Sequence, residues 1–515
     1  MMKNGADSLA GALADAGVDT CFANPGTTEM HLLSAFGREE RIKSHLCLFE
    51  GVATGAADGY ARMRGKPAAT LLHLGPGLAN GLANLHNAKK AATPVINIVG
   101  EHATYHMQFN APLTADIEGL AAPVSDWVGT PQTAADIPRL TSEMLAAISG
   151  PSARVATLVV PNDVAWDPAG DTSATVRPEP LETYDASQLS AAVDALKKGP
   201  QTTLLIGNAC ITSRAAKLAD AISRATGCRV LAEAAVARME RGGDTPPLSR
   251  LPFHVDFATE ALKTVETAVL VGAREPVAFF AYPDRPSRLL PPSAKAIAFS
   301  APLSDLEESL AALATALGVT PSDSVPVSLP DYDGDAALTP EGLGAVVAHT
   351  LPEQAIVVDE SITNGVHLFP SCGQSVAHDW LNNRGGSIGY SLPVAVGAAV
   401  ACPDRRVLSI TGDGSAFYTL QSLWTMARSK LDVTVVILAN RSYKILNNEM
   451  SKIGAGTPSE STIPLMSLAD PEPDWVKLAE GHGVSATRVT DLKGLAAALE
   501  ASYAQTGPKL IEAVL

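Results

Sequence analysis

Aromatic residues and basic charge are both scarce in this sequence. Phe, Trp and Tyr make up 5% of its 515 residues, and 38 Lys and Arg stand against 54 Asp and Glu, which gives a net charge of −16. Nucleic acids and anionic membranes bind proteins through a basic face, which a chain this acidic does not offer in general. We therefore expect neither a nucleic-acid partner nor a membrane partner, although a local basic pocket for a small anion stays compatible with the composition.

Closely spaced cysteine pairs and long apolar runs are also missing. None of the six Cys residues forms a Cys-x-x-Cys pair, so buried thiols in a reducing compartment are favoured over disulfides or zinc ligation. No apolar run reaches the length of a transmembrane helix, and residues 1–7 lack the apolar core of a signal peptide. These absences predict a soluble, cytoplasmic protein.

Short apolar segments that alternate with helical patterns dominate what is present. Strands are predicted at 20–23, 68–72, 94–99, 156–160, 203–206, 229–231, 268–271, 406–411 and 433–438. Such alternation indicates parallel sheets with right-handed crossovers, and the length fits about three domains. We therefore predict an α/β protein with three consecutive doubly wound parallel-sheet domains. The predicted domains are 1–180, 186–325 and 335–515, with linkers around 166–185 and 320–340.

The segment Gly412-Asp413-Gly414-Ser415 lies between two of these strand candidates, and the second strand candidate is followed by Asn440. Ligands of open α/β sheets bind beyond the carboxyl ends of the strands, so the Asp413 and Asn440 side chains should meet there. A carboxylate and a carboxamide can share a magnesium ion whose remaining positions are filled by phosphate oxygens. The glycines let backbone N–H groups approach a phosphate, and the following helix adds a positive dipole end. A Gly-Asp-Gly tripeptide taken alone is more often an ordinary turn.

Three further features have both a structural and a functional interpretation. Glu50 begins an Ala- and Gly-rich helix, where the helix dipole by itself favours a carboxylate. Gly386-Ser387-Ile388-Gly389, taken alone, reads as a glycine-rich turn between a strand and a helix. His73 ends a strand candidate and could be a core histidine or a catalytic one.

These features occur along the chain in the order typical of one family. The sequence resembles the thiamine diphosphate-dependent decarboxylases and carboligases, which include benzoylformate decarboxylase and the acetolactate synthase large subunit. The segments that carry the resemblance are Asn24-Pro25-Gly26-Thr27, Glu50, His73, Pro161-Asn162-Asp163-Val164, the strip from Gly386 to Pro393, Gly412-Asp413-Gly414-Ser415 and Asn440. The resemblance implies thiamine diphosphate and Mg²⁺ as cofactors. It also implies a pyrimidine-binding, a central and a diphosphate-binding domain, in that order.

The resemblance implies roles for single residues as well. Glu50 hydrogen-bonds the pyrimidine ring of the cofactor, Ile388 is the apolar wedge between its two rings, and the Gly386 carbonyl accepts from its amino group. The implied metal ligands are Asp413, Asn440 and the Ser442 carbonyl. One departure is Ala439, where the family usually has an Asn. The implied cofactor-binding residues are Asn24, Pro25, Gly26, Glu50, Thr363, Gly386, Ser387, Ile388, Gly412, Asp413, Gly414, Ser415, Asn440, Ser442 and Tyr443.

Within the family, the sequence is most similar to benzoylformate decarboxylase. That similarity implies that Thr27 contacts the substrate carboxylate, that His73 is catalytic and that Thr363 hydrogen-bonds a phosphate. Benzoylformate decarboxylase has a second catalytic histidine in its central domain, but the corresponding stretch here, 274–283, contains none. Further candidates, which follow a strand end, are His102 and His106.

The function implied by the resemblance is the conversion of a 2-oxo acid. The cofactor ylide would add to the carbonyl, carbon dioxide would leave into the thiazolium electron sink, and the enamine would be protonated or would attack a second carbonyl. The best-matched activity is a benzoylformate decarboxylase-type lyase, and the alternative is an acetolactate synthase-type transferase that joins two 2-oxo acids. The resemblance places the site between subunits, so we expect a homodimer at minimum and a homotetramer as the full assembly.

Three other interpretations are less well supported. A non-catalytic thiamine-binding homologue would not need Glu50, Asp413 and Asn440 together. A nicotinamide-linked dehydrogenase would need a Gly-x-Gly-x-x-Gly turn after a first strand, and none is convincing here. Acetolactate synthases typically bind flavin adenine dinucleotide (FAD) in the central domain, but the glycines that end strands there, Gly207 and Gly272, are too generic to favour FAD.

Overall fold

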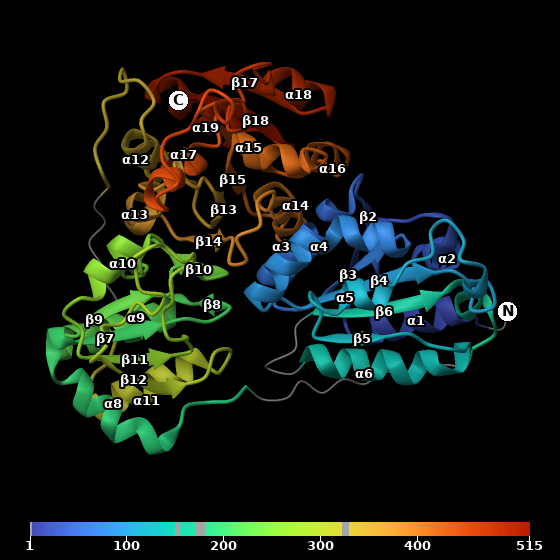
Figure 1. Ribbon diagram of the computed structural model, residues 1–515, viewed down its shortest axis with the longest axis horizontal. Coiled ribbons are helices and arrows are strands. Elements are labelled where there is room, and N and C mark those ends of the chain that lie inside the picture. Colours follow the sequence, from blue (N-terminus) through green and yellow to red (C-terminus); the bar gives the residue numbers. More distant parts are fainter. Residues whose placement is uncertain (1–2, 150–154, 170–180, 322–328) are drawn as a thin grey trace.

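Three α/β units make up the chain in the computed structural model, which describes residues 3–149, 155–169, 181–321 and 329–515. In Figure 1 the N-terminal unit runs from blue to teal, the middle unit from green to yellow and the C-terminal unit from brownish gold to red. The predicted α/β class is confirmed, while the domain boundaries stay predictions. The predicted linkers fall partly on 170–180 and 322–328, which lie outside the described residues. Among the described helices, none has the length and apolar character needed to cross a bilayer.

The N-terminal unit is built on a parallel six-stranded sheet. Its strands lie in the order β2 (Lys43–Leu46), β1 (Thr20–Asn24), β3 (Ala68–Leu72), β4 (Val95–Glu101), β6 (Val155–Pro161) and β5 (Trp127–Gly129). One face carries α1 (Gly5–Asp15), α2 (Met30–Arg38) and α6 (Ile137–Ser149), and the other carries α3 (Glu50–Arg64), α4 (Leu74–Ala91) and α5 (Ile117–Ala121). Because helices cover both faces, the inner strands are continuous apolar runs rather than alternating ones.

The middle unit has a smaller parallel sheet. Its strand order is β12 (Lys295–Ser300), β11 (Thr267–Val271), β7 (Thr202–Ile206) and β9 (Arg229–Ala232). Its helices are α8 (Leu189–Leu196), α9 (Ser213–Thr226), α10 (Val255–Leu262) and α11 (Leu306–Leu317). Local signals fix both ends of α9, since the Thr212 hydroxyl accepts the Ala215 N–H and the helix stops at a left-handed Gly227.

The C-terminal unit contains the largest sheet. Its own strands lie in the order β17 (Ser485–Val489), β18 (Lys509–Val514), β16 (Val433–Ala439), β15 (Val407–Gly412), β13 (Ala355–Glu360) and β14 (His378–Asn382), and all are parallel. Its main helices are α12 (Pro340–Thr350), α14 (Ser391–Ala401), α16 (Ser422–Arg428), α17 (Lys444–Lys452), α18 (Trp475–Gly481) and α19 (Leu492–Tyr503).

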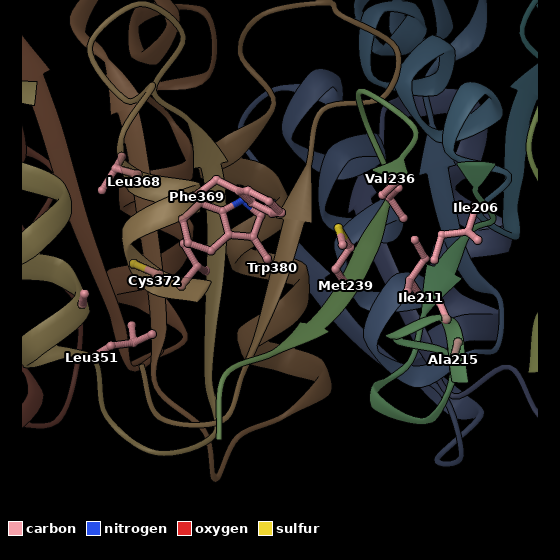
Figure 2. Close-up of a cluster of buried hydrophobic side chains, with 14 of the residues drawn as sticks. Ile206, Ile211, Ala215, Val236, Met239, Leu351, Leu368, Phe369, Cys372 and Trp380 are labelled. Carbon is pink, nitrogen blue, oxygen red and sulfur yellow. The ribbon is translucent and has the colours of Figure 1, made fainter. Parts of the chain in front are cut away.

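Two strands of the middle unit extend the C-terminal sheet instead of their own. β10 (Arg238–Arg241) pairs antiparallel with β14, and β8 (Cys210–Ile211) lies beyond it. At this edge the sheet departs from the predicted all-parallel arrangement. Figure 2 shows the junction, where Met239 faces the cluster that contains Phe369 and Trp380. The middle and C-terminal units therefore share one buried core.

The N-terminal and C-terminal units meet where α3 packs against α14. A β-carbon at Gly59 would lie 2.1 Å from the Val394 carbonyl oxygen. A β-carbon at Gly397 would lie 1.9 Å from the Ala56 carbonyl oxygen. Only glycine lets the two backbones approach this closely.

Candidate active site

Asp413 and Asn440 lie close together at the carboxyl end of the C-terminal sheet, because β15 and β16 are neighbours. The Asp413 side chain is buried and accepts the Arg441 N–H at 2.6 Å and the Gly414 N–H at 2.9 Å. Burial raises the pKa of this carboxyl group. The predicted pairing of the two strand ends is thus present in the fold.

Hydrogen bonds fix the loop that follows β16. Asn440 Oδ1 accepts the Ser442 N–H at 3.0 Å, and Ser442 Oγ donates to the Met466 carbonyl at 3.2 Å. The Tyr443 ring lies against Gly414, where a β-carbon would come within 2.5 Å of Cε1. The predicted metal-binding and phosphate-binding residues of the two loops therefore form one compact group.

The oxygen atoms of this group suit magnesium and a diphosphate. They are a carboxylate, a carboxamide and a backbone carbonyl, the ligands of a hard cation that keeps phosphate oxygens in its remaining positions. A β-carbon at Gly412 would meet no atom within 4 Å, so open space lies beside the start of α15 (Asp413–Ala416). The residues present fit a magnesium ion bound together with a diphosphate.

The glycine strip before α14 is held by the N-terminal unit. Asn87 Nδ2 donates to the Ser387 carbonyl at 2.9 Å, and Asn87 Oδ1 accepts the Ser387 N–H at 3.1 Å. Gly386 and Gly389 have φ values of 81° and 85°, in the left-handed region that favours glycine. Ile388, between them, is partly buried and is the bulky apolar side chain of the strip. This arrangement is compatible with the wedge role that the resemblance implies.

Glu50 is the first residue of α3 and is only 6% exposed. One carboxylate oxygen accepts Asn80 Nδ2 at 3.0 Å, and the other lies 3.1 Å from the point where a β-carbon at Gly77 would stand. No Lys or Arg of the described ranges forms an ion pair with it. The Glu50 carboxyl group is therefore buried between the first turns of α3 and α4, and it can still form a hydrogen bond with a ligand.

Asn84 connects the start of α3 with the glycine strip inside one chain. Its Nδ2 donates to the Gly51 carbonyl at 2.9 Å and to the Gly389 carbonyl at 3.3 Å. His86 Nε2 lies 3.1 Å from the Gly385 carbonyl oxygen nearby. The expectation that Glu50 of one subunit meets the metal-binding half of another stays a prediction.

His73 follows β3 and lies over the turn that follows β1. Its Nδ1 is 2.7 Å from Oε2 of Glu29, whose side chain is fully buried. The same oxygen accepts the Gly26 N–H at 2.8 Å, and a β-carbon at Gly26 would lie 2.3 Å from the His73 ring. Glu29 therefore orients the imidazole. No role was predicted for Glu29 from the sequence, although an acidic residue two positions after the Asn24–Thr27 motif was a visible signal.

The two threonines of this turn have different surroundings. Thr28 Oγ1 donates to Glu29 Oε1 at 2.5 Å and lies 3.4 Å from His73 Nδ1. Thr27 is exposed, and its hydroxyl has no hydrogen-bond partner within the described ranges, so it is free to bond a ligand. Its contact with a substrate carboxylate stays a prediction.

Glu101 and His102 lie at the end of β4, near the His73 pair. Glu101 Oε1 accepts the His102 N–H at 2.6 Å. Burial raises the pKa of Glu101, and the Glu29 carboxylate adds to the rise. Burial lowers the pKa of His102, and the neighbouring His106 and His73 lower it further. The fold thus gathers both additional histidine candidates near His73.

Glu360 ends β13 behind the glycine strip. Its carboxylate accepts the N–H groups of Tyr390 at 3.1 Å and Ser391 at 3.0 Å, and the Thr411 hydroxyl at 3.4 Å. Burial raises the pKa of Glu360 to about 7. Thr363, in the loop that follows, has no hydrogen-bond partner for its hydroxyl among the described residues, and its contact with a phosphate stays a prediction.

A histidine of the middle unit follows directly on an aromatic pair that covers the glycine strip. The Phe279 ring covers Gly386, where a β-carbon would lie 2.6 Å from Cζ, and its centre is 4.7 Å from that of Phe253. His254 follows directly, with its ring centre 5.9 Å from that of Tyr282. Both of its ring nitrogens are buried without a hydrogen-bond partner in the described part of the chain. The stretch 274–283 contains no histidine of its own, but folding of the chain brings His254 next to it.

Protein groups occupy the crevice where the strands of the middle unit end. Glu233 accepts Arg384 Nη2 at 2.7 Å and the Arg274 N–H at 3.1 Å. Its carboxylate lies 2.4 Å from the point where a β-carbon at Gly207 would stand, and a β-carbon at Gly272 would lie 2.5 Å from the Gly207 carbonyl oxygen. The phosphates of a dinucleotide bound here would meet the Glu233 carboxylate and the closely packed turn at Gly207. The expectation that FAD is possible but not favoured stays a prediction.

Two family models match the chain. Residues 3–120 match the N-terminal TPP binding domain of thiamine pyrophosphate enzymes, and residues 365–513 match their C-terminal TPP binding domain. Thiamine pyrophosphate, or TPP, is another name for thiamine diphosphate. The first range contains Glu50 and His73, and the second contains Asp413 and Asn440.

Full-length proteins also resemble the chain. It is 45% identical over 520 residues to a Mycobacterium tuberculosis protein provisionally named acetolactate synthase large subunit IlvX, with 99% of both covered. It is 29% identical over 528 residues to benzoylformate decarboxylase of Pseudomonas aeruginosa, with 96% of both covered. Among solved structures, the thiamine diphosphate-dependent 4-hydroxybenzoylformate decarboxylase of Rhodococcus jostii RHA1 superposes with a TM-score of 0.84, at 26% identity and 99% coverage of both chains.

Proposed function

Because the chain belongs to the thiamine pyrophosphate enzyme family, we propose that it is a thiamine diphosphate- and magnesium-dependent enzyme that removes carbon dioxide from a 2-oxo acid. The observation that carries the proposal is the coexistence in one chain of two site halves. One is the buried Glu50 carboxyl group without a cation, and the other is the adjoining pair of Asp413 and Asn440. A non-catalytic homologue would have no need to keep both.

Each site half has a separate task in this proposal. Asp413, Asn440 and the Ser442 carbonyl hold the magnesium ion and with it the diphosphate. The bound cofactor supplies the electron sink that accepts the electron pair left behind by carbon dioxide. Ile388 and the backbone of the glycine strip orient the cofactor, and Glu50 holds a proton on its pyrimidine side.

His73 is placed to move a proton on the substrate side. Its Nδ1 is occupied by Glu29, so Nε2 is the nitrogen left to exchange a proton with a ligand. The side chain is 23% exposed, whereas Glu29 is fully buried. The buried carboxyl group thus fixes the ring orientation.

His254 is the best-placed second histidine. It adjoins Phe253, whose ring packs against the Phe279 ring that covers Gly386. Neither ring nitrogen has a hydrogen-bond partner in the described residues, and the carboxylates of Asp256 and Glu449 lie 3.9 Å from Nδ1 and Nε2. A second histidine close to the ring that covers the strip would support protonation of the product, and hence decarboxylation as the reaction.

Carboligation of the acetolactate synthase type is the second candidate function. It is supported by the name of the 45% identical relative. It is also supported by the exposed Phe279 and Phe280 rings beside the strip, since an apolar wall that excludes water favours attack on a second carbonyl over protonation.

We propose a homodimer as the smallest active unit and a homotetramer as the full assembly. Large apolar side chains are exposed close to both site halves. Leu46 and Leu48 precede Glu50, and Phe417 and Tyr418 follow the Asp413 segment. Apolar surface gathered around polar site residues is typical of a contact with another copy of the chain.

A panel of 2-oxo acids tests the proposed reaction. Purified protein is incubated with aromatic and aliphatic 2-oxo acids, each with and without an acceptor aldehyde or second oxo acid, and products are identified by mass spectrometry. We expect an aldehyde one carbon shorter, formed only when thiamine diphosphate and Mg²⁺ are both present. A 2-hydroxy-3-oxo acid, or a 2-hydroxy ketone with an acceptor aldehyde, as the main product would favour the second candidate. Full turnover after cofactor stripping and chelation would refute both.

A further inference from the structure

A cavity of about 360 Å³ lies at the junction of the middle and C-terminal units, next to the buried cluster of Figure 2. The segment after β10 forms most of its wall, and the short helix α13 (Leu368–Ser371) closes one side. None of the residues expected to hold thiamine diphosphate or magnesium lines it. Of its wall, the proposed function involves Phe253 alone, as the neighbour of His254, and it leaves the cavity itself without a role.

Two arginines flank one aromatic ring in the wall of this cavity. Cζ of Arg241 lies 3.5 Å from the centre of the Phe369 ring, and Cζ of Arg250 lies 3.7 Å from the same centre. Two groups this close to one ring centre must lie on opposite faces. Each gains a cation–π contact, but the ring does not neutralise either charge.

Both guanidinium groups lack a direct counter-ion. Arg241 is 5% exposed; its Nη2 donates to the Phe369 carbonyl at 2.7 Å, and its Nη1 has no hydrogen-bond partner in the described residues. Arg250 donates to Asn382 Oδ1, and neither arginine forms an ion pair within the described ranges. Burial lowers the pKa of Arg241 to about 9, and the Arg250 charge adds to the fall. An unpaired buried charge is costly, so these groups favour an incoming anion.

Asp359 is the carboxylate whose charge affects both arginines, but its oxygens already accept hydrogen bonds from other groups. Asp359 Oδ1 accepts the Ser361 N–H at 3.0 Å and the Ser361 hydroxyl at 2.5 Å, and Oδ2 accepts Trp380 Nε1 at 3.2 Å. Asp359 therefore acts on the arginines only from a distance. One carboxylate also cannot balance two guanidinium charges.

We propose that this cavity binds a small molecule that carries a phosphate group next to an apolar ring, at a site separate from that of the cofactor. Guanidinium groups present parallel N–H donors that match phosphate oxygens. Ser249, in the same wall, adds a hydroxyl group, and the Phe253 ring is 48% exposed and offers a surface on which a second ring can stack. The cavity volume leaves room for both parts of such a ligand.

Calorimetric titration of the holoenzyme with phenyl phosphate tests this proposal. The enzyme is first saturated with thiamine diphosphate and Mg²⁺, so that the diphosphate site is filled. We expect saturable binding, and we expect Arg250→Gln and Arg241→Gln each to weaken it at least about tenfold, because each removes a charged hydrogen bond. The matched control is Arg285→Gln, which removes an exposed positive charge paired with Asp256 on the same unit and should bind as the wild type does.

Two results would overturn the proposal. One is the absence of measurable binding to the saturated holoenzyme. The other is equal affinity of Arg250→Gln and Arg285→Gln, which would place the probe elsewhere, including the substrate pocket. Thermal unfolding shows which variants are folded. If Arg241→Gln does not fold, the partly buried Arg250 alone decides the question.

Discussion

His73 Nδ1 lies 2.7 Å from Oε2 of Glu29, a carboxylate with no exposed surface. This contact determines which ring nitrogen is left for chemistry, because the bonded nitrogen is occupied and the other is not. It also places a carboxyl group beside the imidazole that we propose transfers a proton during turnover. The pair is therefore the first target for mutation.

We expect His73→Ala to lower kcat at least about tenfold, which corresponds to about 1.4 kcal/mol of barrier. Glu29→Gln should lower kcat in the same direction, because the Glu29 carboxyl group holds the imidazole ring in the orientation that leaves Nε2 for a ligand. Steady-state kinetics across pH measures both effects. Glu143→Gln, an exposed acid paired with Arg139, is the control. An unchanged rate for His73→Ala would make that histidine structural.

Glu50→Gln should abolish exchange of the cofactor C2 proton for deuterium while leaving cofactor affinity largely intact. The amide keeps the size and the contact with Asn80 but cannot hold the exchangeable proton of a carboxyl group. Proton NMR of quenched samples measures the exchange, and calorimetry measures the affinity. Exchange at the wild-type rate in this variant would remove Glu50 from the proposed mechanism.

Asp413→Asn should weaken magnesium-dependent binding of thiamine diphosphate at least about tenfold, because the only carboxylate of the oxygen group is lost. Burial raises the pKa of Asp413, and magnesium binds the ionised form. Affinity in the wild type should therefore already fall at a pH where an ordinary Asp is still ionised. Titrations at several pH values test this, with Asp432→Asn, a partly exposed acid paired with Arg406, as the control. A pH-independent affinity would contradict the metal role.

Glu360 should stabilise the folded protein at low pH, and this contribution to the free energy of unfolding should be lost as the pH rises from about 4.5 to about 7. The folded state raises the pKa of Glu360, so in this interval the folded protein binds more protons than the unfolded one, and stability falls as pH rises. Glu360→Gln should remove this part of the slope. Urea denaturation at a series of pH values measures it, and exposed Glu353→Gln should leave the slope unchanged. A wild-type slope in Glu360→Gln would assign the effect to other groups.

Gly397→Ala should destabilise the protein by about 2 kcal/mol or more, because its β-carbon would lie 1.9 Å from a backbone oxygen that cannot move alone. Gly11→Ala is the matched control. Its β-carbon would meet no atom within 4 Å in α1, so the exchange should be neutral or should stabilise by up to about 1 kcal/mol. Urea denaturation compares the two variants. Equal midpoints of urea denaturation for the two variants would show that α3 and α14 do not pack this closely in solution.

Local patterns in the sequence were sufficient for the fold class and for one half of the site. Each short apolar run bounded by glycine or a polar turn became a strand, because strand formation and turn geometry depend on neighbouring residues. The Asp413 and Asn440 positions were predictable for the same reason, since consecutive strands of a parallel sheet end at one edge. The antiparallel β10–β14 pair was not predictable, because β10 lies far from β14 in sequence and pairs with it only after two units have packed together.

Only the tertiary structure decided which polar groups are partners. Nothing in the sequence links His73 with Glu29, His254 with the stretch around Phe279, or Arg241 and Arg250 with Phe369. These relationships depend on burial, which makes the energy of a charge depend on neighbours that can lie more than a hundred residues away. The sequence by itself determined the family resemblance, the strands predicted from apolar runs and the strand ends at which we propose that the metal binds. The fold determined the orientation of the residues that we propose transfer protons, and it left two buried positive charges beside an open cavity.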